Sequence, residues 1–318
     1  MPGPEISFGI HLPTRSLRGG EPEPPTPELL NQMVDSAKDA GFSSIWVTDH
    51  IVFFDPWLDC MLLLASIAGR AKERDMAIAT GVMGLPLRHP VAMAQSFATL
   101  DILCGGNLIV GVGEGSTRSD FDALGIPFDQ RRKILNDGIV AMRALLSEQN
   151  VTHQGEFYSF ENVRIAPASI QKPGPPIWIS SWGSPAGMRR VAQLGDGWVA
   201  SALHSTPEEF GEAKWLLSGA LLSASKDPNT FPHAVDTMFM YMDEDGDRAR
   251  AIAGPIIGRS SGSPFDPESG HYLVGNGDEC LRLLARWIDA GARPVCVWPV
   301  LDPVGQVRKF GEEVISRL

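Results

Sequence analysis

The apolar residues of this chain fall into short runs, and longer segments with amphipathic spacing separate the runs. Several runs are apolar at nearly every position, which is typical of strands whose two faces are both covered. Eight runs predict strands, over residues 6–12, 44–48, 76–83, 107–113, 177–180, 197–200, 235–242 and 294–298.

Segments with helical spacing follow these runs. Proline stands in the expected first turn of several of them, where a missing N–H leaves no hydrogen bond unmade. The predicted helices cover residues 27–40, 57–71, 90–104, 128–147, 185–194, 207–223, 247–257, 278–290 and 303–316. Repeated strand–helix units imply a parallel sheet, and eight of them favour closure over an open sheet. We therefore predict an α/β fold, a (β/α)8 TIM barrel formed by one domain over residues 1–318.

Two segments interrupt this alternation and are expected as insertions in the barrel. In residues 151–165, Gly155 separates two short runs, which indicates a hairpin. Residues 258–275 are rich in Gly, Ser and Pro and show little periodicity. A long irregular segment of this kind is typical of a functional loop or lid, or of a mobile region.

Charge and cysteine content narrow the classes of partner. Lysine and arginine number 27 and aspartate and glutamate 38, so the formal charge is −11, which argues against a nucleic-acid or anionic-membrane partner.

The four cysteines form no Cys-x-x-Cys pair, which fits a reducing compartment and indicates neither disulfides nor zinc. The first residues do not resemble a signal peptide, and the longest uncharged apolar stretch, 60–69, is too short to cross a bilayer. We expect a cytoplasmic protein.

Candidate catalytic residues are sought where strands end, because barrel active sites lie at the carboxyl ends of the strands. The second strand ends in Asp49-His50, and histidine is the side chain best suited to proton transfer near neutral pH. The alternative is that this pair caps the following loop. One carboxylate and one imidazole do not make a metal site, and His11 stands alone after the first strand, so no metal is expected.

Glycines mark the ends of the third and fourth strands. Gly81-Val82 would let a flat ligand approach the backbone closely, or would only form a turn. The fourth strand runs into Gly113-Glu114, in a Gly-x-Gly-x-Gly run that is not the dinucleotide fingerprint. Glu114 would serve as an acid, or would form a salt bridge at the rim with one of three arginines, Arg88, Arg118 and Arg131.

The fifth strand leads into small hydroxyl residues before a predicted helix. The run is Ser180, Ser181, Trp182, Gly183 and Ser184, followed by Pro185. The free N–H groups and the dipole of a helix N-terminus attract anions, so this segment is a candidate phosphate site. The alternative is that Ser184 is a plain helix cap.

Several segments of the chain together resemble the bacterial-luciferase-like superfamily, whose members are flavin- or deazaflavin-dependent oxidoreductases with a (β/α)8 barrel. The similarity extends over most of residues 5–200. Residues 41–50 read GFSSIWVTDH and residues 175–187 read PPIWISSWGSPAG. The other matching segments are residues 79–115, 121–131 and 195–198.

The resemblance implies a role for each candidate. In the superfamily the tricyclic ring stacks on a bulge at the end of the third strand, often with a non-proline cis peptide, and Gly81-Val82 matches this position. The Asp-His pair of deazaflavin-dependent members matches Asp49-His50 and places the histidine near the hydride-carrying carbon. The run from Ser180 to Ser184 matches the phosphate loop.

These implications lead to the hypothesis of hydride transfer between bound deazaflavin, coenzyme F420, and a small organic substrate. The catalytic residues would be His50, as general acid and base, together with Asp49, which holds it, and Glu114. Gly81, Val82, Gly113 and the segment 180–184 would hold the cofactor, with Glu114 beside the ring and phosphate. One alternative is a two-component monooxygenase that uses reduced FMN from a separate flavin reductase. Another is a flavin-binding barrel without turnover. A homodimer is expected from the superfamily.

Overall fold

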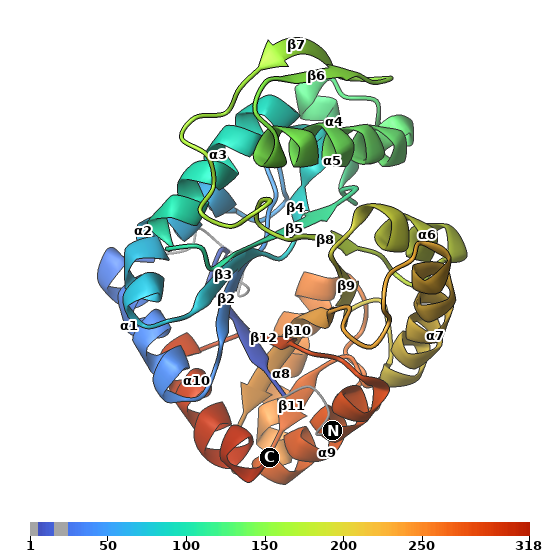
Figure 1. The fold of residues 1–318 in the computed structure, drawn as a ribbon. Helices are drawn as coiled ribbons and strands as arrows, with labels where there is room; N and C mark the ends of the chain where they lie inside the picture. Colours follow the sequence, from blue (N-terminus) through green and yellow to red (C-terminus); the bar gives the residue numbers. More distant parts are fainter. Residues whose placement is uncertain (1–5, 16–24) are drawn as a thin grey trace.

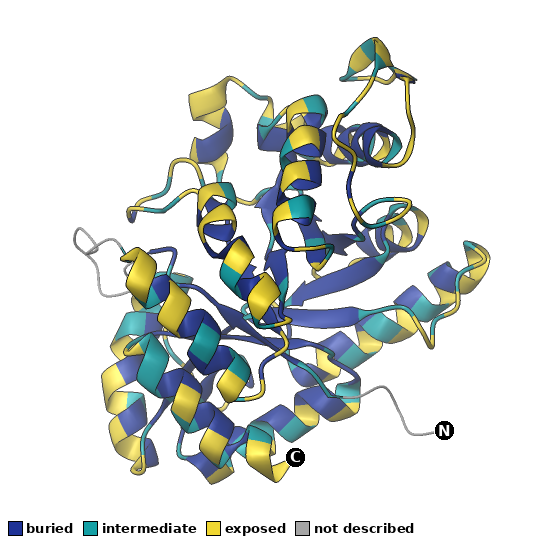
Figure 2. Ribbon diagram, turned by 60° about the vertical axis from the view of Figure 1, so that its left-hand side comes forward, coloured by how far each residue is buried: buried dark blue, intermediate teal, exposed yellow. Residues whose placement is uncertain are grey.

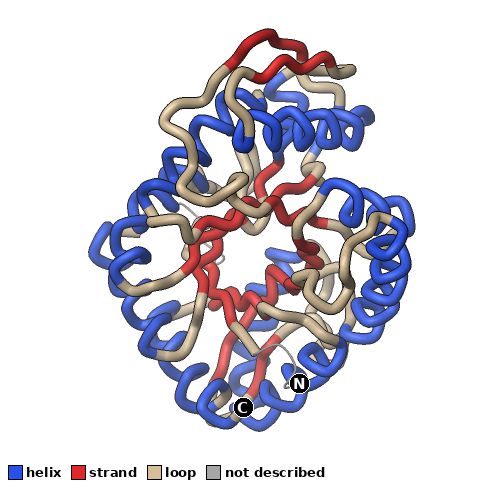
Figure 3. The backbone as a smooth tube through the Cα atoms, in the orientation of Figure 1, coloured by secondary structure: helices blue, strands red, loops and turns tan. Residues whose placement is uncertain are grey.

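The structure is a computed structural model, and it describes residues 6–15 and 25–318. Eight parallel strands form a closed barrel (Figures 1 and 3). In barrel order they are β1 (Phe8–His11), β2 (Ser44–Val47), β3 (Ala77–Thr80), β5 (Leu108–Gly113), β8 (Ile177–Ser180), β9 (Gly197–Ser201), β10 (His233–Met242) and β12 (Val295–Pro299). Strand β12 pairs with β1, which closes the ring. The predicted (β/α)8 barrel is confirmed.

Helices surround the ring of strands on all sides in Figure 3. They are α1 (Pro27–Asp39), α2 (Cys60–Glu73), α3 (Pro90–Leu103), α4 (Arg118–Leu124), α5 (Arg131–Ser147), α6 (Pro185–Leu194), α7 (Pro207–Ser223), α8 (Gly246–Ser261), α9 (Gly277–Ala290) and α10 (Pro303–Glu313). Short 3-10 turns cover Leu85–Leu87, Phe128–Gln130 and Ile315–Arg317. Within residues 6–15 and 25–318, none of the helices combines the length and the apolar character that crossing a membrane requires.

The burial pattern explains why these segments adopt their structures. Every residue of β1, β2 and β12 is buried, whereas the helices alternate between buried and exposed positions (Figure 2). Helix α9 buries Cys280, Leu284, Trp287 and Ile288, which lie on one face at the helical period. A separate cluster of buried apolar side chains, contributed by the barrel strands, consists of Trp46, Ala79, Trp178, Val199, Ala234 and Cys296.

The hairpin predicted in residues 151–165 is confirmed. Strands β6 (Val151–Gln154) and β7 (Ser159–Val163) pair antiparallel and lie outside the barrel, at the top of Figure 1. Asp137 of α5 holds the hairpin, since its carboxylate accepts hydrogen bonds from His153 Nε2 at 2.7 Å and from the backbone N–H of Phe157 at 2.7 Å. Burial opposes ionisation of Asp137, but these hydrogen bonds outweigh it and lower the pKa of the carboxyl.

Residues 258–275 are less irregular than predicted. Helix α8 continues through Ser261 and ends at Gly262, whose φ of +70° suits glycine. The segment finishes in β11 (Leu273–Gly275), which pairs with the outer half of β10. Glycine and serine occur inside the last turns of α8, so composition alone does not distinguish this part of the helix from a loop. The expected irregular stretch is therefore limited to the residues between Gly262 and β11.

Two further differences from the predictions concern the helices α2 and α4. The helix predicted over 57–71 begins at Cys60, because the Asp59 side chain accepts a hydrogen bond from Leu62 N at 2.9 Å and so caps α2. Trp57 instead forms an isolated bridge with Arg15. Helix α4 was not predicted, since a helix of two turns carries too little periodicity to be recognised.

His233 at the start of β10 makes the fold sensitive to acid. It is 6% exposed, and burial lowers the pKa of its imidazole to about 4. An unfolded histidine titrates near 6.5, so between about 6.5 and 4 the unfolded chain binds a proton that the folded chain does not.

We expect the free energy of unfolding to fall by up to about 3 kcal/mol through this group as the pH drops from 7 to 4. Replacing the imidazole with a group that does not titrate, in His233→Gln, removes this contribution. Urea unfolding at several pH values checks it, and parallel stability–pH curves for the two proteins would contradict the assignment.

Candidate active site

The loops at the carboxyl ends of the strands enclose a cavity of about 590 Å³. Of the residues expected to form the site, only Gly183 does not line it. The lining residues among the candidates are Asp49, His50, Gly81, Val82, Gly113, Glu114, Ser180, Ser181, Trp182 and Ser184. The structure therefore brings together residues from the ends of four different strands.

The break in the third strand forms part of this cavity. Strand β3 ends at Thr80, the Gly81-Val82 peptide is cis, and the chain resumes pairing in β4 (Met83–Gly84). A Cβ atom on Gly81 would lie 2.8 Å from the Trp46 ring and 3.0 Å from Asp236 Oδ2. Only glycine fits here, so the backbone itself forms the surface that a ligand would meet.

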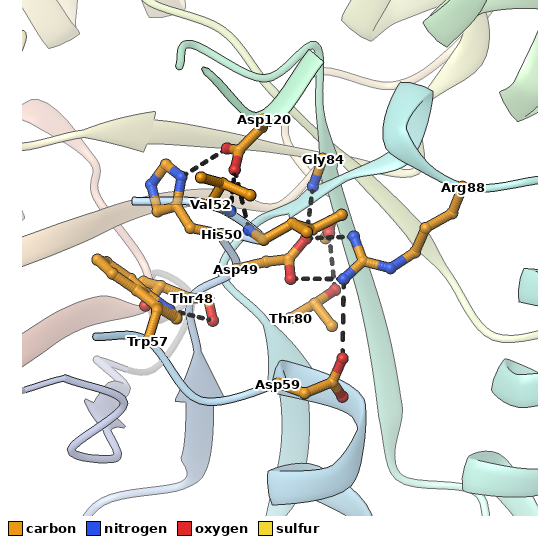
Figure 4. A network of polar contacts seen from close by, with 12 residues as sticks. Thr48, Asp49, His50, Val52, Trp57, Asp59, Thr80, Gly84, Arg88 and Asp120 are labelled. Atoms are coloured by element: carbon orange, nitrogen blue, oxygen red, sulfur yellow. Dashed lines mark hydrogen bonds and ion pairs between the residues drawn. The ribbon is translucent and has the colours of Figure 1, made fainter. Parts of the chain in front are cut away.

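Asp49 lies beside this bulge and is tied to it. Its carboxylate accepts two hydrogen bonds from Arg88, at 2.6 and 2.8 Å, and one from the backbone N–H of Gly84 at 3.2 Å (Figure 4). The Asp49 side chain is fully buried. A buried charge requires such complete pairing. Asp49 makes no hydrogen bond to His50, so the expectation that it holds the histidine is wrong.

His50 is held by Asp120 instead. The Nδ1 atom of His50 lies 2.9 Å from Asp120 Oδ2, on α4 (Figure 4). The other oxygen of Asp120 accepts the backbone N–H groups of Ile51 and Val52, at 3.0 and 2.6 Å. With Nδ1–H donating to a carboxylate, the second ring nitrogen, Nε2, is left as an acceptor, which is the arrangement of a general base.

Glu114 forms the salt bridge that was one of its two predicted roles. Its carboxylate lies 3.0 Å from Arg132 Nε, 3.7 Å from Arg131 and 3.7 Å from Arg190. Of the three partners predicted for it, only Arg131 is correct. Arg88 pairs with Asp49, and Arg118 lies near Asp129. Three guanidinium groups around one carboxylate leave an excess of positive charge on this side of the cavity.

The start of α6 lies on the same side. The Ser184 side chain accepts a hydrogen bond from Gly187 N at 3.2 Å and caps the helix. Ser181, Ser184, Gly187 and Arg190 all line the cavity. The cap is therefore real, and the helix N-terminus also faces the cavity with hydroxyl groups and a guanidinium around it, as an anion site requires.

Trp182 and Gly183 were both expected to hold the cofactor, but Gly183 does not line the cavity and Trp182 lies only at its border. The Trp182 side chain is 56% exposed and stacks on the ring of His204, with the centroids 3.9 Å apart. It borders the cavity without closing it. Gly183, with a φ of +89°, turns the backbone between Trp182 and the helix cap.

The other half of the cavity is aromatic and was largely missed. Phe53, Trp57, Phe239 and Trp298 line it, together with Arg15. Of these residues, only Trp298 stands at the carboxyl end of a predicted strand, that of residues 294–298, where barrel active sites are sought. His11 lies beneath, pairs with Asp236 and stacks against Trp298. Among the described residues, no three His, Cys, Asp or Glu side chains are grouped so that they could bind a metal.

The chain was compared with known protein families. The profile of the luciferase-like monooxygenase family matches residues 6–290. The chain belongs to this family.

Curated relatives of this luciferase-like chain include enzymes named for F420 or for pterin reduction. It is 29% identical over 230 residues to the 5,10-methylenetetrahydromethanopterin reductase of Archaeoglobus fulgidus, which covers 72% of this chain and 64% of that protein. It is 26% identical over 311 residues to the F420-dependent hydroxymycolic acid dehydrogenase of Mycobacterium tuberculosis, covering 89% and 82%. The match thus spans less than two thirds of the first of these proteins.

Solved structures confirm the fold of the luciferase-like chain. The monooxygenase RslO1 from Streptomyces bottropensis superposes with a TM-score of 0.84 at 22% identity, over 98% of this chain and 99% of that one. An F420-dependent secondary alcohol dehydrogenase in complex with an F420-acetone adduct gives 0.79 at 21% identity, again over 98% and 99%.

The His50–Asp120 contact can be tested directly. Asp120→Asn removes the charge that orients the imidazole, so we expect the turnover number to fall about 10- to 100-fold, since a small misplacement of a reacting group has an effect of this size. Asp122→Asn, at an exposed position of the same helix, serves as the matched control and should leave it unchanged. Equal activity of the two variants would contradict the assignment.

Proposed function

We propose that this protein is an oxidoreductase that transfers a hydride between coenzyme F420, bound in the cavity, and a small organic substrate. The observation that carries the proposal is the division of one cavity into three parts. These parts are a glycine-lined bulge, His50 with its partner Asp120, and an arginine-rich anion site, all of which line the cavity. Relatives named F420-dependent support the same reading.

The residues present fit such a cofactor. Gly81 and Val82 line the cavity, and because Gly81 has no side chain, a flat ring there would lie against bare backbone. Ser181, Ser184 and the first turn of α6 offer donors for a phosphate. F420 carries, besides its phosphate, a tail with further carboxylates, and the excess positive charge of Arg131, Arg132 and Arg190 suits that tail better than a single phosphate.

When bound, the deazaflavin supplies the carbon that carries the hydride; the protein supplies position and proton transfer. His50, with Nδ1–H donated to Asp120, takes a proton from a substrate hydroxyl at Nε2, or returns it to a substrate oxygen in the reverse direction. Asp120 fixes the orientation of the imidazole through its contact with Nδ1. Asp49 and Arg88 act indirectly, because they fix the bulge on which the ring would rest.

An FMN-dependent monooxygenase is the second candidate. It is favoured by a 32% identity over 192 residues to the 4-hydroxyprotoasukamycin monooxygenase of Streptomyces nodosus, which covers 60% of this chain and 51% of that protein. A phosphate at α6 fits FMN as well, and such an enzyme would need a separate flavin reductase.

The four cysteines are unpaired and buried, which supports a reducing, cytoplasmic compartment. We also expect a homodimer, as in the superfamily.

Titration of the purified protein with F420 and, separately, with reduced FMN decides between the two. We expect F420 to bind at a lower cofactor concentration than reduced FMN does, with F420 binding followed by the quenching of its fluorescence. We also expect no oxygen to be consumed in the presence of F420 and an alcohol substrate. Tighter binding of reduced FMN with consumption of oxygen would reverse the order. Failure to turn over any substrate with either cofactor would leave a flavin-binding barrel without activity.

Arg190 provides a quantitative test of the anion site. A hydrogen bond to a charged group contributes about 1.5–3 kcal/mol, so Arg190→Gln should weaken F420 binding about 10- to 100-fold and reduce its sensitivity to salt. Arg189→Gln, which removes an exposed neighbour on the same helix, should bind F420 like the wild type. Equal affinities of the two variants, measured by fluorescence titration, would place the phosphate elsewhere.

A further inference from the structure

The aromatic half of the cavity contains a buried cation that the proposed reaction does not use. Arg15 follows β1, lines the cavity, and exposes only 4% of its side chain. Its Cζ atom lies 4.8 Å from the ring centroid of Trp57, 5.4 Å from that of Phe53 and 5.7 Å from that of Trp298. Three aromatic rings therefore hold the guanidinium group in place without neutralising it.

No described carboxylate is hydrogen-bonded to this cation. The nearest carboxylate, Asp55, lies 3.8 Å from Arg15 Nη1, which is too far for a hydrogen bond. The other oxygen of Asp55 is bound by Arg259 at 2.5 Å. Among the described residues, the two guanidinium groups and this one carboxylate leave a net charge of +1. Burial lowers the pKa of Arg15 to about 10, so the group stays charged at neutral pH.

Polar atoms at this end of the cavity also lack partners. Within the described residues, Arg15 Nε and Nη1, Asp55 Oδ2 and the hydroxyl of Ser260 are buried without a hydrogen bond. Of these residues, Arg15 and Ser260, which belongs to α8, line the cavity. Buried polar groups are nearly always hydrogen-bonded in folded proteins. A ligand that enters this cavity meets Arg15 and Ser260, and an acceptor group on the ligand would give these donors a partner.

We propose that Arg15 and Ser260 form a carboxylate-recognition site, and that the substrate has an apolar, ring-sized body with one carboxylate. The aromatic walls accept the body. The planar fork of the guanidinium matches the two oxygens of a carboxylate, and one negative charge balances the excess of +1. The inference deepens the proposed function and rests on it, because it names the class of substrate that the same cavity would take.

The position of His50 makes this site useful for the reaction. The His50 ring lies 4.3 Å from Phe53 and 4.6 Å from Trp57, centroid to centroid, and Trp57 is also the nearest of the three rings to Arg15. His50 and Arg15 thus pack against the same two rings, and both line the cavity. Anchoring by the carboxylate would fix which carbon of the substrate lies next to His50.

The test compares an acid with its neutral analogue. Phenylacetate and phenylacetamide have the same body and differ in charge, so we measure the binding of each by calorimetry and tryptophan fluorescence, with and without bound cofactor. We expect phenylacetate to bind at least about 10-fold more tightly, and Arg15→Gln to abolish the difference. Arg15→Lys, which keeps the charge but not the fork, should retain part of it. Arg248→Gln, at an exposed salt bridge on α8, is the matched control and should retain all of it.

Each outcome separates this inference from the proposed function. Equal binding of acid and amide to the wild type, or an unchanged preference in Arg15→Gln, would overturn the carboxylate site and leave F420 binding untouched. A preference for the acid in a protein that binds neither F420 nor FMN would keep the site and reject the proposed function. Circular dichroism and thermal unfolding show whether Arg15→Gln is folded, and if it is not, the response of Arg15→Lys decides.

Discussion

A carboxylate buried without any exposed surface must find donors inside the protein, and the pairing of Asp49 meets this need at the point where the cavity is formed. Its partners come from two later segments, the bulge after β3 and the turn before α3, which are 35 and 39 residues away in sequence. The ion pair therefore joins the second and third strand–helix units. The glycine surface at Gly81 and the loop that carries His50 both begin at this junction.

The barrel could be predicted from the sequence because its strands are buried on both faces and so appear as apolar runs. The strand ends were then enough to find most of the residues that line the cavity. The pairing of the polar groups could not be found in this way. Asp49 is the chain neighbour of His50, but successive residues after a strand point in different directions, and the carboxylate that reaches the imidazole belongs to the short helix α4.

The same limit applies to the charged groups at the two ends of the cavity. The partners of Glu114 depend on how α5 and α6 are rotated, and periodicity gives the buried face of a helix but not the reach of Arg132 or Arg190. Arg15 is one arginine in an acidic chain, and nothing in its sequence neighbours indicates three aromatic rings around it. The net charge of −11 therefore gives no sign that four arginines, Arg15, Arg131, Arg132 and Arg190, line the cavity.

The pair of Asp55 with Arg259 has a mechanical consequence. It connects the loop after β2 with helix α8, residues separated by 204 positions in sequence, across the space between the second and the seventh strand–helix units. Asp55 is buried, whereas the Arg259 side chain is 44% exposed, so dissolved ions reach one partner and weaken the attraction. The attraction that ties these two units together at this point therefore weakens as the salt concentration rises, whereas the hydrogen-bonded strands of the barrel do not depend on it.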